Sequence, residues 1–111
     1  MSGEVDLDRI LDDYRSKGLH EVVEKVGEWA FHISDLPVQL KIKVVRVMPQ
    51  GQYMGIANYR IQNPKQETPY MNICLCDTID EALNDALRGF MTFWPPEEYK
   101  DKTKFVPVED W

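Results

Sequence analysis

The sequence contains little cysteine and no long apolar run, and both absences restrict the class of protein. The two cysteines, Cys74 and Cys76, are separated by one residue, a spacing at which a disulfide has poor geometry. We therefore expect reduced thiols and a cytoplasmic protein. No apolar run approaches the ~20 residues that cross a membrane, and the acidic first residues do not resemble a secretory signal. We expect no membrane association.

Side chains that could form a zinc site, a phosphate-binding loop or a catalytic site are also scarce. Zinc sites need about four ligands, whereas the two cysteines are accompanied only by His20 and His32 in different predicted elements. Gly51 and Gly55 are isolated and lack the lysine and hydroxyl residue of a phosphate-binding loop. His32 is not accompanied by a complete catalytic set of nucleophile and orienting acid. We therefore predict no catalytic residue, no metal and no cofactor.

Acidic residues are absent from 36–66, although the whole chain has a net charge of −6. The basic residues of this stretch are Lys41, Lys43, Arg46, Arg60 and Lys65. Acidic segments flank it, and opposite charges are usually interspersed on a protein surface. We expect the protein's own acids to complement these bases. We do not expect nucleic acid as the partner, because domains that bind it are usually basic overall.

What is present is the composition of a folded domain. The 111 residues are 43% hydrophobic and 11% aromatic, well above the level of a disordered chain. A chain of this length fits one domain, so we predict a single α+β domain over residues 1–111.

Helical periodicity is found near both ends. Apolar residues recur at this spacing over 7–14, and again over 19–26, which predicts a second short helix or a kinked continuation of the first. Thr78 and Glu81 have the spacing of a capping box, and an apolar stripe from Ile79 to Phe90 follows them.

Alternation of period two predicts four strands, near 28–34, 38–45, 53–61 and 70–76. The pair Val44-Val45 breaks the alternation, which indicates a bulge or the end of the strand. Short connections favour antiparallel pairing. The predicted fold is therefore α+β, with an N-terminal helical segment, a four-stranded mostly antiparallel sheet, a C-terminal helix on one sheet face and an ordered tail. Residues 104–108 are a candidate edge strand in that tail.

Two features supply candidate binding residues. Lys41 and Lys43 share the sheet face opposite Leu40 and Ile42, with His32 beside them if the first two strands pair. Aromatic residues provide the second feature, because Tyr and Trp are common interface anchors and also common core residues. The predicted binding residues are His32, Lys41, Lys43, Tyr59, Trp94 and Trp111.

Two family resemblances are limited in extent. The order of elements resembles that of double-stranded-RNA-binding domains, but the last helix begins Thr78-Ile79-Asp80-Glu81, acidic where that family places lysines. The stretch from Cys76 to Leu83 resembles the strand-to-helix junction of HicB-type antitoxins, and any capped amphipathic helix can produce the same string. We therefore base the functional prediction on the residues alone.

These observations predict a small, non-enzymatic binding or regulatory module. It would contact a protein partner, or a second copy as a homodimer, through its sheet and aromatic C-terminal tail. The alternative is a binder of a small molecule or anion, with or without enzymatic activity, that uses His32, Lys41 and Lys43. The absence of an assembled catalytic set favours the first interpretation.

Overall fold

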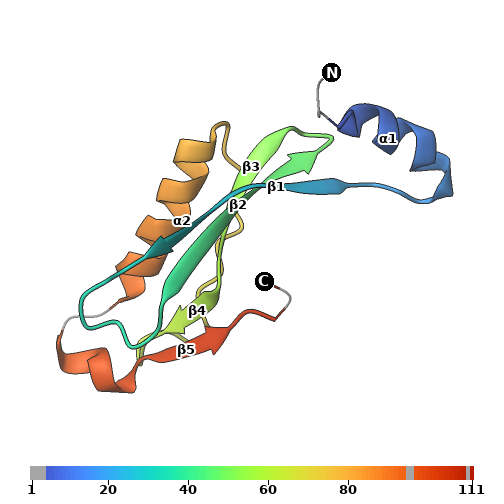
Figure 1. Ribbon diagram of the computed structural model, residues 1–111. Coiled ribbons are helices and arrows are strands. Elements are labelled where there is room, and N and C mark those ends of the chain that lie inside the picture. Colours follow the sequence, from blue (N-terminus) through green and yellow to red (C-terminus); the bar gives the residue numbers. More distant parts are fainter. Residues whose placement is uncertain (1–4, 95–96, 110) are drawn as a thin grey trace.

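The computed structural model describes residues 5–94, 97–109 and 111. The elements are α1 (Leu7–Tyr14), the 3-10 helix η1 (Arg15–Lys17), β1 (Val22–Phe31), β2 (Leu40–Met48), β3 (Gln52–Ala57), β4 (Tyr59–Gln62), α2 (Ile79–Phe93), the 3-10 helix η2 (Glu97–Lys102) and β5 (Lys104–Pro107) (Figure 1). The predicted α+β class is confirmed, since both sheets are antiparallel and α2 packs on the larger one.

The larger sheet has the strand order β1-β2-β3, with β2 in the centre. Val44 and Val45 are both buried within β2, so this apolar pair continues the strand and does not end it. The bulge lies instead in β1, between Lys25 and Gly27. The ring of Trp29 occupies the space that a Cβ atom on Gly27 would need.

The helix predicted over 19–26 is wrong, because most of this stretch belongs to β1. Val22 pairs with Met48 and Val23 pairs with Val47 of β2. Apolar residues at positions 19, 22, 23 and 26 suggested a helix, but β-branched valines also favour strands. The long partner strand β2 supplies the backbone hydrogen bonds that decide between the two.

The strand predicted over 53–61 is divided at Asn58. The Asn58 Oδ1 atom accepts a hydrogen bond from the backbone nitrogen of Lys41 at 2.8 Å, and its Nδ2 atom donates to the Gln39 carbonyl at 3.0 Å. β4 then forms a second sheet with β5, in which Ile61 pairs with Phe105. The predicted sheet of four strands is thus replaced by sheets of three and two strands, and the strand predicted over 70–76 is wrong, because this stretch forms only an isolated bridge between Cys76 and Tyr53. The tail packs on the domain as expected.

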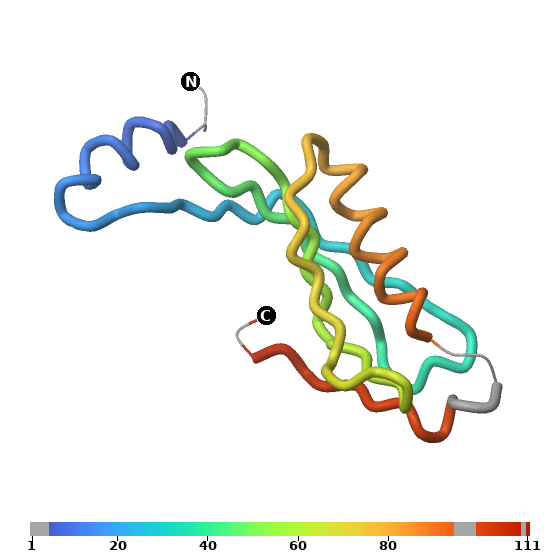
Figure 2. The backbone as a smooth tube through the Cα atoms, turned by 180° about the vertical axis from the view of Figure 1, so that it is seen from behind, coloured from blue at the N-terminus to red at the C-terminus, as the bar shows by residue number. Residues whose placement is uncertain are grey.

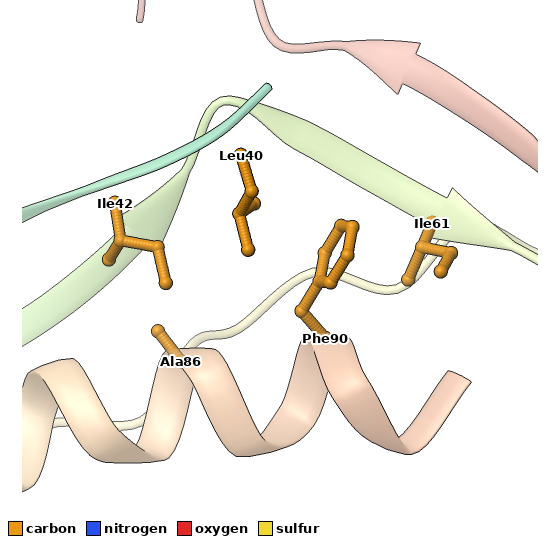
Figure 3. Close-up of a cluster of buried hydrophobic side chains, with 5 residues drawn as sticks. All are labelled: Leu40, Ile42, Ile61, Ala86 and Phe90. Atoms are coloured by element: carbon orange, nitrogen blue, oxygen red, sulfur yellow. The ribbon is translucent and has the colours of Figure 1, made fainter. Parts of the chain in front are cut away.

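The core lies between α2 and the strands. Its fully buried members come from β2, β4 and α2 and are Leu40, Ile42, Ile61, Ala86 and Phe90 (Figure 3). Glu81 donates its backbone amide to the Thr78 Oγ1 atom at 3.1 Å, which confirms the predicted start of α2. Capping and the apolar stripe together fix α2 above the sheet.

A glycine allows α2 to approach β3 closely. An added Cβ atom on Gly55 would lie 2.5 Å from the Ala82 carbonyl oxygen and 2.8 Å from the Ala86 Cβ atom. The helix backbone therefore lies directly above Gly55, and no larger residue fits there without a shift.

The molecule is elongated, with extents of 53 × 30 × 22 Å. α1 lies at the opposite end of the molecule from α2 (Figure 1) and contacts β2. Leu11 is the buried residue of α1. The main core and α1 therefore occupy separate parts of the same sheet.

Candidate binding site

The structure brings together two of the predicted binding residues. The Lys43 ammonium donates to the Trp111 carbonyl oxygen at 2.8 Å and lies 5.3 Å from the centre of its indole ring. The indole Nε1 atom in turn donates to the Ile56 carbonyl at 2.8 Å. The tail thus folds over the basic sheet face and engages Lys43.

The other predicted residues lie elsewhere. His32 is exposed on the loop after β1, and Lys41 is half-buried on the face of β2 that also carries Lys43. Tyr59 packs against the core. Trp94 also packs there, with its ring 5.7 Å from that of Phe105. A binding role for these side chains stays a prediction, since they form no common site with Lys43 and Trp111 in the structure.

The basic stretch is complemented only in part by the protein's own acids. Arg46 forms an ion pair with Glu24 of β1 at 2.8 Å. For Lys41 and Arg60, the structure gives no ion pair among the residues that it describes. The expected balance of charge therefore holds at Arg46 and not along the whole stretch.

A different surface is formed by the segment Tyr70–Cys76, which we call the edge segment. It runs beside β3 on the way to α2 (Figure 2). Tyr53 and Cys76 exchange backbone hydrogen bonds of 2.8 and 2.7 Å, and Tyr70 donates its amide to the Ile61 carbonyl at 2.8 Å. The segment is therefore fixed at both ends, while its middle forms no strand ladder with β3.

In the middle of the edge segment, the side chain of Asn72 connects the segment to β3. Its Oδ1 atom accepts from the Cys74 amide at 3.4 Å, and its Nδ2 atom donates to the Gly55 carbonyl at 2.9 Å. In the register set by Tyr53 and Cys76, a regular ladder would join Cys74 directly to Gly55. The carboxamide of Asn72 takes the place of that bond.

The apolar side chains of the edge segment are exposed. The exposed fraction is 54% for Met71, 71% for Ile73 and 43% for Leu75. These three residues alternate along the chain, as the sequence predicted for one face of a strand. No residue of the segment carries a formal charge at neutral pH.

The backbone of the edge segment is also open on its outer side. The amides of Tyr70 and Cys76 donate to the Ile61 and Tyr53 carbonyls, and the amide of Cys74 donates to the Asn72 side chain. Backbone groups alternate in direction along an extended chain, so we infer that the amides of Met71, Ile73 and Leu75 lie on the outer side. These outward groups have no hydrogen-bond partner among the residues that the structure describes. The segment is thus an unpaired edge with an apolar face.

A cavity of about 260 Å³ lies between the edge segment and β3. We call it the edge cavity. Met54 and Ile56 line it from β3, Met71 and Ile73 line it from the edge segment, and Ala86 of α2 also contributes. Its lining is mainly apolar, and its size suits one or two apolar side chains of a partner.

Two ionisable side chains of the edge segment have pKa values above their ordinary values. Burial, reinforced by the nearby Asp85 carboxylate, raises the pKa of Tyr70 above its ordinary value. Burial also raises the pKa of the Cys76 thiol, and the carboxylates of Asp85 and Glu81 add to the effect. A thiol that stays protonated is a poor nucleophile, so Cys76 is less nucleophilic than a cysteine with an ordinary pKa.

The residues of the edge segment are not among the predicted binding residues, although their alternating apolar pattern is present in the sequence. The pattern from Tyr70 to Cys76 was predicted as a strand with three apolar residues on one face. An uncharged alternating run usually indicates a strand whose apolar face is buried. Its exposure depends on how far α2 and β3 extend, which the local sequence does not encode.

Comparison with known proteins gives no relative. No protein-family model, no curated protein and no solved structure matches this chain. Within the described residues, no cluster of three His, Cys, Asp or Glu side chains could hold a metal ion. In the same part of the chain, no helix combines the length and hydrophobicity needed to span a membrane.

Proposed function

We propose that this protein is a non-catalytic binding module that docks an extended segment of a partner polypeptide on the edge segment. The observation that carries the proposal is the exposure of Met71, Ile73 and Leu75 on an uncharged segment, where their backbone groups have no hydrogen-bond partner in the described part of the chain. Addition of a strand to such an edge satisfies the backbone and covers the side chains at once.

The edge segment lacks the usual protection against this kind of pairing. Natural proteins shield exposed edges with charged side chains, prolines or strong bulges. Between Tyr70 and Cys76 there is no charge and no proline. The opposite edge of the sheet is different, since β1 carries Glu24, Lys25 and Glu28 and also contains the bulge.

The basic sheet face supports the alternative function less well. Lys43 is already engaged by Trp111, and His32 lies on a loop outside the β1–β2 pairing. An anion would have to compete with the tail for Lys43. We therefore favour the edge segment over the residues that the sequence suggested.

Selection from a display library of random nine-residue peptides tests the proposal. We expect enrichment of peptides with alternating apolar residues, because these can pair with the edge and fill the edge cavity. The selected peptides should perturb the amide resonances of Met71, Ile73 and Leu75.

A charged variant supplies the control. Ile73→Lys should abolish binding of the selected peptides, whereas Val23→Lys should retain it, because Val23 is a 53% exposed apolar residue on the opposite edge strand. Equal binding to wild type and Ile73→Lys, or no enrichment at all, would refute the proposed function.

A further inference from the structure

The exposed apolar residues Met71, Ile73 and Leu75 are spaced so that the edge segment can pair with a second copy of itself. We propose that a second copy of this chain pairs with it, antiparallel and centred on Ile73, so that the two edge segments form a two-stranded ladder. This inference rests on the proposed function, and it specifies both the partner and the register.

The segment is complementary to itself in this register. Ile73 of one copy lies opposite Ile73 of the other, and Met71 lies opposite Leu75 on both sides. Residues directly opposite in an antiparallel pair contact each other through their side chains. The outward backbone groups of Met71, Ile73 and Leu75 would exchange hydrogen bonds with the same groups of the second copy, as expected for an interface with twofold symmetry.

Charge opposes the pairing of two copies less at the edge segment than elsewhere on the surface. Each chain has a net charge of −6, so two copies repel each other over most of their surfaces. The edge segment is uncharged, and in this register Asp77 lies opposite Pro69 of the second copy and not opposite an acid. The pairing therefore brings no like charges face to face within the paired strands.

The small size of the contact predicts a weak dimer. Two seven-residue strands bury less surface than the ~1,200–2,000 Å² of standard stable interfaces. We expect dissociation constants in the range of tens of micromolar, so that the dimer is seen at about 100 μM and lost on dilution.

Cysteine cross-linking tests the register. In a Cys74→Ser/Cys76→Ser background, the single variants Met71→Cys, Ile73→Cys and Leu75→Cys are compared under mild oxidation. Directly opposite Cα atoms lie about 4.5–5.5 Å apart, within the range for a disulfide. Met71 of one copy and Met71 of the other are offset by four residues, or about 13 Å.

The expected result is a selective pattern. Ile73→Cys should cross-link with itself, Met71→Cys and Leu75→Cys should each remain monomeric alone, and an equal mixture of these two should give the cross-linked heterodimer. Far-UV circular dichroism checks that each variant is folded. Sedimentation of the native-cysteine protein gives a second measurement, in which Ile73→Lys should lose the dimer and Val23→Lys should retain it.

Other patterns overturn the inference. Equal cross-linking at all three positions would indicate face-to-face packing, and no cross-linking of any variant, with no dimer in sedimentation, would exclude a second copy. If no dimer forms but library peptides still bind wild type and not Ile73→Lys, only the proposed pairing with a second copy is refuted, and the proposed function stands. If the peptides also fail, both proposals are refuted.

Discussion

Single residues set the close approach between α2 and the sheet. Gly55 lies under the Ala82 carbonyl and the Ala86 methyl group, and the ring of Tyr70 occupies the space beside Gly89. Because these glycines have no side chain, Ala86 and Tyr70 can lie close to them, and both residues line the edge cavity. Tyr70 also packs against Phe93, with ring centres 5.1 Å apart.

Replacement of Gly55 by alanine should destabilise the fold. The added methyl group would overlap the helix backbone, and overpacking of this kind costs about 1–3 kcal/mol. Urea denaturation measures the change in the free energy of unfolding. Gly51→Asn is the matched control, because Gly51 has a φ of +73° with open space around it and asparagine tolerates this conformation. A similar loss in both variants would contradict the close approach at Gly55.

The two cysteines should differ in reactivity. The thiolate is the reactive form, and burial together with the Asp85 and Glu81 carboxylates raises the pKa of Cys76. Iodoacetamide at pH 8 should therefore modify Cys76 more slowly than the exposed Cys74, as followed by mass spectrometry. Because the folded state holds this proton more tightly, stability should also fall as pH rises above the ordinary cysteine pKa. Faster modification of Cys76 would contradict the argument.

At the scale of the element, the edge segment combines fixed ends with a displaced middle. Hydrogen bonds of Tyr70 and Cys76 hold its ends, and Asn72 replaces the missing ladder bond between them. This arrangement keeps the chain extended and leaves its outer edge available. It also opens the edge cavity beside β3.

Removal of the Asn72 side chain should loosen this element. Asn72→Ala removes both bridging hydrogen bonds, and a typical hydrogen bond contributes about 1 kcal/mol. Hydrogen exchange of the Cys74 amide should become faster, while the amides of α2 keep their rates. Asn84→Ala, on the exposed surface of α2, is the control and should leave the Cys74 amide unchanged. Unchanged exchange in Asn72→Ala would show that the bridge carries little of the local stability.

At the scale of the whole molecule, the chain is more extended than its length requires. The radius of gyration of its Cα atoms is 16.7 Å, whereas a compact domain of this length has about 13 Å. The difference arises because α1 and the end of the β2–β3 hairpin project away from the main core (Figure 1). The basic face and the edge segment lie on the main body, apart from this projection.

Small-angle X-ray scattering should detect this shape. We expect a radius of gyration of about 17 Å or slightly more for the dilute protein, because hydration and side chains add to the Cα value. The radius of gyration of the Ile73→Lys variant should stay the same at high concentration. That of the wild type should increase, because two copies pair. A value near 13 Å for the dilute protein would mean that α1 folds back onto the core.

Local sequence patterns determined several elements. The capping residues Thr78 and Glu81 and the following apolar stripe predicted α2, and alternation predicted most of β2. Both are local signals, in which the side chains and the backbone period agree. Local patterns also predicted the tail strand β5, whereas the strand predicted over 70–76 forms only an isolated bridge between Cys76 and Tyr53.

Only the tertiary structure decided the site. The valines of β1 fit a helix or a strand, and pairing with β2 selected the strand because it supplies backbone partners along the whole stretch. Lys43 and Trp111 are 68 positions apart and meet only because the tail returns over the sheet. The exposure of Ile73 follows from where the sheet ends, and the end of a sheet is set by non-local packing, not by the residues of the edge itself.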